Sequence, residues 1–163
     1  MFTLHCTAKL RDRLNRRTSD VRHPPSTDLG DWYATALFWK PQLVLLVNER
    51  TLLPVLLLLA PAATLPERIG PTVARVLERH GIAPEFIERE MVAMADVEIA
   101  KTGNRRVVGT MNEFVFQAEV YRDHGGITDL LHLAMRLAET PCGAIGYDSP
   151  VRLLHQVVAG TAQ

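Results

Sequence analysis

The sequence is poor in cysteine, in aromatic residues and in excess charge of either sign. Its two cysteines, Cys6 and Cys142, lie in no C-x-x-C pair and no zinc-finger spacing. Two isolated thiols fit a reducing compartment, so we expect a cytoplasmic protein. Lys plus Arg and Asp plus Glu number 18 each. A neutral chain has no global attraction to nucleic acid or to an anionic membrane, so such a role needs a local patch.

The chain also lacks an uninterrupted hydrophobic run of about 20 residues, the length that spans a membrane. The apolar stretch Leu43–Ala63 is broken by the polar residues Asn48–Thr51. We interpret it as two buried strands joined by a turn, and we expect no membrane contact. The N-terminus places apolar residues before basic ones, the reverse of a secretory signal.

Signatures of common catalytic and cofactor sites are missing as well. The sequence contains no G-K-[ST], G-x-G-x-x-G, G-x-S-x-G or H-x-x-x-H motif. His5 and Cys6 are adjacent in an expected strand, so their side chains point to opposite faces and do not share a metal. We therefore predict no cofactor and no metal, and we identify no catalytic residue.

What is present is a series of strand and helix patterns. Strands are predicted at residues 2–6, 32–39, 42–47, 52–59 and 97–101, with a further short strand at 106–109. Helices are predicted at residues 7–14, 64–81, 84–94, 110–122, 128–138 and 149–159. The fold class is α+β: a mostly antiparallel sheet of about five or six strands, packed by about five or six helices that concentrate in the C-terminal half. We expect one globular domain over residues 1–163, with a flexible loop at about residues 15–29.

The segment from residue 101 to residue 113 is the leading candidate site. Gly109 precedes a predicted helix whose first amides lack internal partners and carry partial positive charge. With basic side chains nearby, this segment is a candidate anion site. Its candidate ligand-binding residues are Lys101, Asn104, Arg105, Gly109, Thr110 and Asn112. The alternative is that Thr110 and Glu113 form a capping box that satisfies those amides.

The same segment carries a family resemblance. Residues Asn104–Glu113 resemble an N-R-S-V-L-G-S-M-N-D signature of small bacterial and phage proteins with a domain of unknown function. Similar phrases occur in the same order at Cys6–Leu10, Gly30–Ala34 and Asn48–Leu52. Arg106 stands where the signature has Ser, which argues against a hydroxyl role there. The resemblance implies no activity.

Two further candidate positions lie at strand ends. At Asp31 and Trp32 a carboxylate stands beside an aromatic ring. One interpretation is that the ring lines a ligand pocket, and the alternative is that it packs on the sheet. Asn48 and Glu49 lie at a hairpin turn, where polar residues are expected in any case. A lone carboxylate such as Glu49 is usually only solvated, although it could act as an acid or base.

Three functional hypotheses follow. The first is a binding or regulatory protein that recognises a partner protein or a small anionic ligand through residues 101–113. The second is an enzyme acting on a phosphorylated or nucleotide substrate. The third is nucleic-acid binding through the basic segment Lys9–Arg22. The alternative for this segment is a solvated loop without a binding role. Broad apolar faces on the helices after Gly126 also favour a homodimer.

Overall fold

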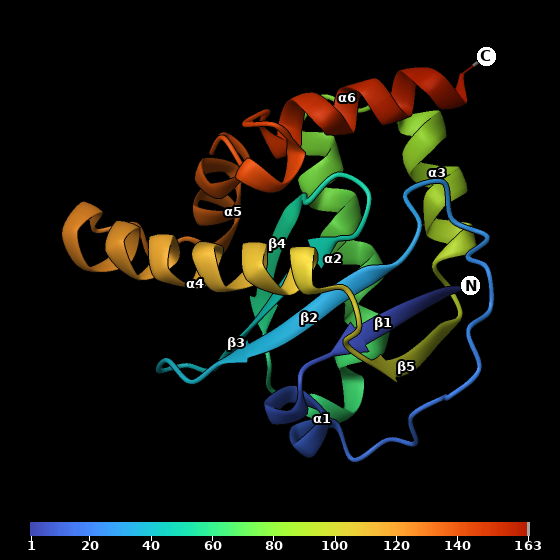
Figure 1. Cartoon of the computed structure of the whole chain (residues 1–163), viewed down its shortest axis with the longest axis horizontal. Helices are drawn as coiled ribbons and strands as arrows, with labels where there is room; N and C mark the ends of the chain where they lie inside the picture. Colours follow the sequence, from blue (N-terminus) through green and yellow to red (C-terminus); the bar gives the residue numbers. More distant parts are fainter. Residues whose placement is uncertain (163) are drawn as a thin grey trace.

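The chain folds around a five-stranded sheet with helices on both faces (Figure 1). The computed structural model describes residues 1–162, so Gln163 of the predicted domain lies outside the described residues. The strands are β1 (Phe2–Cys6), β2 (Trp32–Leu37), β3 (Leu43–Asn48), β4 (Pro54–Leu58) and β5 (Val97–Lys101). Their order across the sheet is β4-β3-β2-β1-β5.

Six α-helices and two short 3₁₀ helices surround this sheet. The α-helices are α1 (Ala8–Leu14), α2 (Leu65–Arg79), α3 (Pro84–Ala93), α4 (Arg105–Gly125), α5 (Leu130–Ala138) and α6 (Pro150–Thr161). The 3₁₀ helices are η1 (Ala62–Thr64) and η2 (Gly143–Ile145). No helix within residues 1–162 is both long and apolar enough to cross a membrane.

The sheet is mixed because β1 pairs in parallel with both of its neighbours, β2 and β5. The pairs β2–β3 and β3–β4 are antiparallel, and the second is a hairpin. The predicted α+β class, the five strands and the six helices are confirmed. Antiparallel pairing holds only for the β2–β4 part. Strands separated by a long crossover can pair in parallel, and the connections between β1, β2 and β5 are of that kind.

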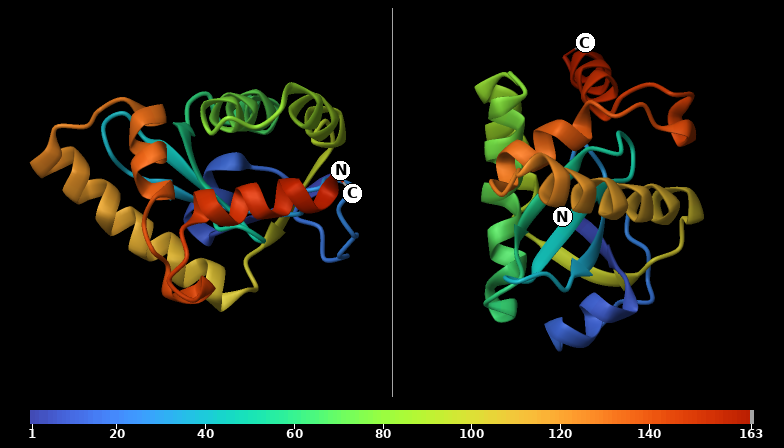
Figure 2. Two further views of the ribbon diagram at one scale, coloured as in Figure 1. Left: turned by 90° about the horizontal axis from the view of Figure 1, so that it is seen from above. Right: turned by 90° about the vertical axis from the view of Figure 1, so that its left-hand side faces the viewer.

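Two hydrophobic cores lie on opposite faces of the sheet. Residues of α2, α3 and α6 pack on one face, and residues of α4 and α5 pack on the other. Figure 2 shows the sheet between α2–α3 and α4. Along β3, Val44 and Leu46 enter the first core while Leu45 and Val47 enter the second. The sequence prediction of strands covered on both faces is therefore correct for β3.

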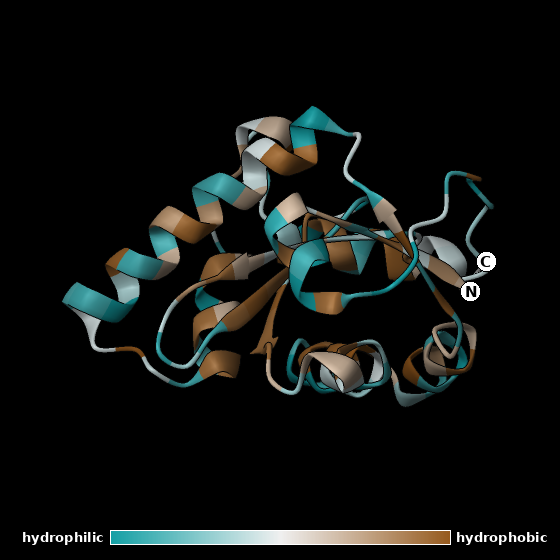
Figure 3. Ribbon diagram, turned by 90° about the horizontal axis from the view of Figure 1, so that it is seen from below, coloured by the Kyte–Doolittle hydropathy of each residue, from teal (hydrophilic) through white to brown (hydrophobic). Residues whose placement is uncertain are grey.

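Hydropathy follows this layering. In Figure 3 the strands are mainly hydrophobic, whereas α4 alternates between hydrophobic and hydrophilic turns. Leu133 and Leu137 of α5 lie in one core, and Leu154 of α6 lies in the other with Val157 and Val158 packed against it. Since these side chains fill the cores of their own chain, they give little support to a homodimer, which stays a prediction.

Helix α4 begins earlier than the sequence pattern indicates. The predicted strand at residues 106–109 and the predicted capping box at Thr110 are wrong, because α4 starts at Arg105. The side-chain oxygen of Asn104 accepts hydrogen bonds from the amides of Arg106 and Val107, at 3.0 and 3.4 Å. Thr110 is buried within the helix, and its hydroxyl donates to the Arg106 carbonyl oxygen at 3.1 Å. Asn104 is therefore the N-cap.

Other helix starts agree more closely with the sequence. Pro84 opens α3, and Ser149 caps α6 by accepting from the Arg152 amide. Helix α5 is capped by Asp129, one residue after the predicted Thr128, because the Asp129 carboxylate accepts from the His132 amide at 2.7 Å. Thr64 precedes α2 but makes no side-chain cap, since its hydroxyl donates to the Pro61 carbonyl oxygen.

The predicted loop at residues 15–29 contains no helix or strand and runs around the β5 side of the sheet (Figure 1). Its backbone is held at several points. The Ser19 amide donates to the Ile99 carbonyl oxygen at 2.7 Å, and the Ser26 amide donates to the Met1 carbonyl oxygen at 2.9 Å. The buried carboxylate of Glu90 accepts from the amides of Asp28 and Leu29. These bonds place the end of the loop, and with it Asp31, beside β1.

His80, at the end of α2, should make the free energy of unfolding depend on pH. Burial lowers the pKa of His80 to about 4, and the charge of His155 adds to this. The unfolded chain then binds a proton near pH 6.5, its ordinary value, while the folded chain does not. We expect the free energy of unfolding to fall by up to about 3 kcal/mol as the pH drops through this window, and to level off below it.

Urea unfolding across this pH range measures the effect. In His80→Gln most of the acid-induced loss should vanish, whereas in His124→Gln, which alters an exposed histidine, it should persist. An identical pH dependence in wild type and His80→Gln would contradict the assignment.

Candidate functional site

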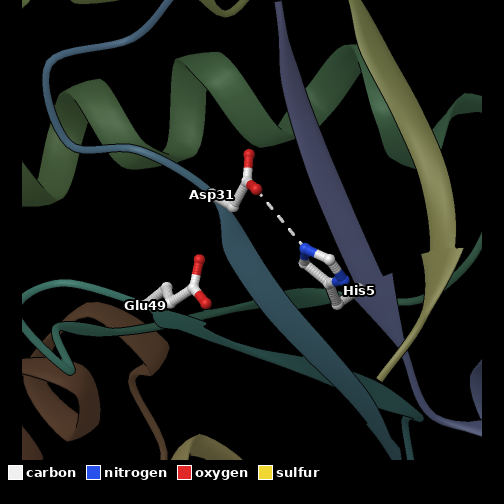
Figure 4. Close-up of side chains that lie close together, drawn as sticks. All are labelled: His5, Asp31 and Glu49. Carbon is white, nitrogen blue, oxygen red and sulfur yellow. Dashed lines mark hydrogen bonds and ion pairs between the residues drawn. The ribbon is translucent and has the colours of Figure 1, made fainter. Parts of the chain in front are cut away.

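The face of β1 that is turned away from the α2–α3 core carries polar side chains, which are nonetheless largely buried. Leu4 and Cys6 face the core under α2 and α3, so alternation along the strand turns Thr3 and His5 toward the α4 side. Asp31 lies just before β2, next to β1, and Glu49 lies in the β3–β4 turn. Figure 4 shows His5, Asp31 and Glu49 close together. Residues far apart in sequence therefore meet at one position.

Both ring nitrogens of His5 have oxygen neighbours. Nδ1 lies 3.1 Å from the Lys101 carbonyl oxygen, and Nε2 lies 3.4 Å from Oδ2 of Asp31. One ligand atom from each of His5, Asp31 and Glu49 lies within 4.8 Å of the other two. A histidine and two carboxylates at this spacing have the composition of a divalent metal site or of an acid–base site.

The His5–Asp31 pair is electrostatically coupled. Burial alone lowers the pKa of His5, but hydrogen bonds to Asp31 and Lys101 and the charges of Asp31 and Glu49 outweigh it, so the pKa is raised. Burial raises the pKa of Asp31, yet hydrogen bonds from His5 and from the Thr3 amide, together with the charge of His5, lower it overall. Asp31 is 1% exposed and accepts from the Thr3 amide at 2.9 Å. Both shifts therefore favour the charged form of this buried pair.

Tyr33 holds the imidazole in place. Its ring stacks on His5 with centroids 4.6 Å apart and an interplanar angle of 22°. Its hydroxyl oxygen accepts a hydrogen bond from the Asn104 amide at 2.9 Å. Burial, more than the nearby charge of Glu49, raises the pKa of Tyr33. Tyr33 thus connects the His5 cluster to the start of α4.

His5 of this cluster also lines a hollow of about 220 Å³ that we name the β1 pocket. Its lining consists of Thr3, His5, Ser19, Asp20, Val21, Arg22, Ala100 and Lys101. Thr3 is 3% exposed, and within residues 1–162 its hydroxyl oxygen has no hydrogen-bond partner. Arg22 reaches from the loop to Glu49 at 3.7 Å. The pocket therefore combines both signs of charge with an unpaired buried hydroxyl.

The structure distributes the predicted site residues over several environments. Asp31 belongs to the His5 cluster, and Lys101 lines the β1 pocket. Asn48 is fully buried: its amide nitrogen donates to the carbonyl oxygens of Leu29 and Asp31, and its side-chain oxygen accepts from Arg50 and Thr51. Trp32 is fully buried in the core under α2. Asn48 and Trp32 therefore present no surface to a ligand.

A second hollow, of about 420 Å³, lies beside the first turns of α4, and we name it the α4 hollow. It is lined by Thr102, Gly103, Arg105, Val108, Gly109 and Asn112. Three predicted ligand residues, Arg105, Gly109 and Asn112, thus share one surface. Asn104 and Thr110 lie outside the lining, because one caps the helix and the other is buried in it.

His5 and Glu49 are the functional candidates that sequence reasoning missed. The sequence pattern excludes a metal shared by His5 and Cys6, because the two side chains point to opposite faces, and it favours a solvated carboxylate at Glu49. The available signal was a histidine inside an otherwise apolar strand. No spacing in the sequence indicates that Glu49 approaches it, because the contact depends on strand pairing.

The cysteines do not form a reactive site. Both are free and buried. Burial raises the pKa of the Cys6 thiol to about 12 and that of Cys142 to about 11, with smaller effects from Arg11 and Glu113. A thiol with so high a pKa is almost entirely protonated near neutral pH, so neither cysteine is an activated nucleophile.

The basic segment Lys9–Arg22 makes contacts within the chain. Arg13 lies over the Phe38 ring at 5.1 Å. Arg16 pairs with Glu67 at 3.3 Å, and Arg22 approaches Glu49 at 3.7 Å. These contacts reduce the charge available to nucleic-acid phosphates.

Comparison with known proteins identifies the family. The model of the family described as "Domain of unknown function (DUF6933)" matches residues 3–153. The chain belongs to this family, in agreement with the resemblance to a domain of unknown function. No curated protein and no solved structure matches the chain.

The position of the α4 cap can be tested by substitution. We expect Asn104→Ala to lower the free energy of unfolding by about 1 kcal/mol, because the amides of Arg106 and Val107 lose their acceptor. Glu113→Gln, which alters the other proposed capping box, should leave stability within about 0.5 kcal/mol of wild type. Chemical denaturation of both variants gives the answer, and the opposite ranking would restore the cap at Thr110.

Proposed function

We propose that the protein is a small binding protein that recognises an anionic ligand at the α4 hollow. The observation that carries this proposal is the gathering of Arg105, Gly109 and Asn112 around one hollow. Arg105 offers a guanidinium that matches the geometry of a phosphate or carboxylate, and Asn112 offers an amide donor. The ligand is a small phosphate- or carboxylate-bearing molecule, or the acidic side chain of a partner protein.

The charge around the hollow supports an anion. Within residues 1–162, no carboxylate lies within ion-pair distance of the side chains of Lys101, Arg105 or Arg106. Unpaired cations that are close in sequence produce a local positive potential, although the chain as a whole is neutral. Side chains rather than helix amides supply the donors, because Asn104 already occupies the amides of Arg106 and Val107.

Gly109 adds a second support. It lies exposed inside α4, where glycine costs about 1 kcal/mol relative to alanine. A Cβ at this position would meet no atom within 4 Å, so packing does not require glycine. A ligand that approaches the helix backbone is a physical reason for leaving this surface bare.

Gly109→Ala separates these effects. We expect it to raise the free energy of unfolding by roughly 0.5–1 kcal/mol and to weaken binding of an anion such as inorganic phosphate. The matched control is Gly160→Ala on α6, where the glycine is also exposed with open space around it. That variant should gain stability without any change in affinity.

Binding is measured by calorimetric titration of chelator-treated protein with inorganic phosphate, beside native mass spectrometry of the protein as purified. Arg105→Ala should weaken the phosphate affinity, and Arg79→Ala, which alters an exposed arginine on α2, should not. Equal affinities in Arg105→Ala, Gly109→Ala and wild type would rule the α4 hollow out as the anion site.

An enzyme acting on a phosphorylated or nucleotide substrate is the second candidate. This hypothesis groups Lys101, Arg105 or Arg106 with Glu49, Asn112 or Asp31 and expects them in one cleft. One observation favours it: Asp31 and Glu49 lie beside His5, which lines the β1 pocket together with Lys101. Arg105 and Asn112 line the α4 hollow instead, which counts against it. It predicts that the protein releases phosphate from phosphate esters and that His5→Gln abolishes the release. If the folded protein is inactive toward monoesters and nucleotides, with and without added divalent metal, this candidate fails.

A further inference from the structure

The contact of His5 with the Lys101 carbonyl oxygen turns its Nε2 atom toward Asp31. The Lys101 carbonyl oxygen only accepts hydrogen bonds, so its contact with Nδ1 at 3.1 Å requires the proton to be on Nδ1. Nε2 then faces Asp31 at 3.4 Å, and in the imidazolium it donates its proton to this carboxylate. Once that proton is lost, Nε2 carries the lone pair that a metal ion can bind. With Nε2 unprotonated, His5, Asp31 and Glu49 offer three ligand atoms that lie within 4.8 Å of one another.

We propose that His5 Nε2, Asp31 and Glu49 bind a divalent transition-metal ion such as Zn²⁺ or Mn²⁺ on the inner wall of the β1 pocket. Two ligand atoms about 2.1 Å from a tetrahedral ion lie about 3.4 Å apart. The distance from Nε2 to Oδ2 of Asp31 is 3.4 Å. The Glu49 side chain is 21% exposed, and its one ion pair within residues 1–162 is the 3.7 Å contact with Arg22, so it is free to turn toward an ion.

The surroundings are those of a metal site with an outer shell. A histidine ligand usually donates its other ring N–H to a carbonyl or carboxylate, and His5 does so to Lys101. Asp31 is oriented by the Thr3 amide, and the His5 ring is oriented by the stacked Tyr33. His5 and Asp31 are therefore held in position before the ion arrives.

Thr3 is an independent indication of a ligand. It is 3% exposed, lines the same pocket and lies two residues before His5 on the same face of β1. Within the described residues its hydroxyl has no partner. A buried hydroxyl without a hydrogen bond costs free energy. A water molecule on the metal ion would satisfy it, which leaves an open coordination position toward the pocket.

The choice of metal follows from the ligand set. One imidazole with two carboxylates suits Zn²⁺ or Mn²⁺, whereas Mg²⁺ prefers oxygen ligands alone and retains several waters. Two carboxylates also neutralise the charge of a divalent ion. Cys6, the nearest thiol in sequence, faces the opposite core and takes no part.

Calorimetric titration of the chelated, folded protein with Zn²⁺ and with Mn²⁺ tests the proposal, with Mg²⁺ as the comparison. We expect one Zn²⁺ or Mn²⁺ ion per chain. His5→Gln and Glu49→Gln should each weaken the affinity for the metal ion by more than about tenfold. Loss of a residue that only supports a ligand typically weakens metal affinity by at least about tenfold, so loss of a ligand should cost more. His23→Gln is the matched control, because His23 pairs with Glu98 at 3.0 Å on the exposed surface without a third ligand. It should bind as wild type does.

Wild type that is folded by circular dichroism and binds neither ion would overturn the proposal, as would unchanged affinity in His5→Gln and Glu49→Gln. If His5→Gln does not fold, Glu49→Gln alone tests the proposal, because Glu49 is partly exposed and its substitution should leave the protein folded. NMR of the imidazole nitrogens provides a second measurement: the ion should shift Nε2 of His5 and leave Nδ1 protonated. Phosphate binding by chelated protein is measured separately, so failure at the α4 hollow and failure at the metal site are distinguishable.

Discussion

The parallel pairing of β1 between β2 and β5 is the constraint on which the rest of the structure depends. In this register His5 lies opposite Tyr33 on one side and Ala100 on the other, and Cys6 lies opposite Lys101. A shift by one residue would turn His5 into the hydrophobic core and expose Leu4 and Cys6. The burial of Phe2, Leu4 and Cys6 therefore fixes the position of the polar cluster on the other face.

Asp31 links β1 to the β3–β4 turn through hydrogen bonds. Its carboxylate accepts from the Thr3 amide, which ties it to β1. Its carbonyl oxygen accepts from the Glu49 amide at 3.0 Å and from the Asn48 side chain at 3.2 Å, which ties it to the β3–β4 turn. Asn48 therefore contributes to the site from beneath, as the residue that places Glu49. This role explains why a fully buried amide follows an otherwise apolar strand.

The sequence was sufficient for local structure and insufficient for long-range pairing. Alternation and turn residues located all five strands, and Pro84 and Ser149–Pro150 located two helix starts. The sequence pattern favours Thr110 as the cap of α4, and only the structure identifies Asn104 as the N-cap, with its amide held by the Tyr33 hydroxyl. The partners of His5 come from three other segments. The strand pairing that brings these segments together cannot be read from the hydrophobic periodicity of the sequence.

The energetics of the His5–Asp31 pair argue against a purely structural role. A buried ion pair recovers little more than its desolvation cost, and apolar residues of similar volume often serve stability as well or better. Two further features add to the cost: Glu49 brings a second negative charge to the cluster, and the Thr3 hydroxyl is buried without a partner. All three costs fall on the face of β1 that opens to the pocket. A bound cation would offset all of them at once, since it neutralises the carboxylates and orders a water near Thr3.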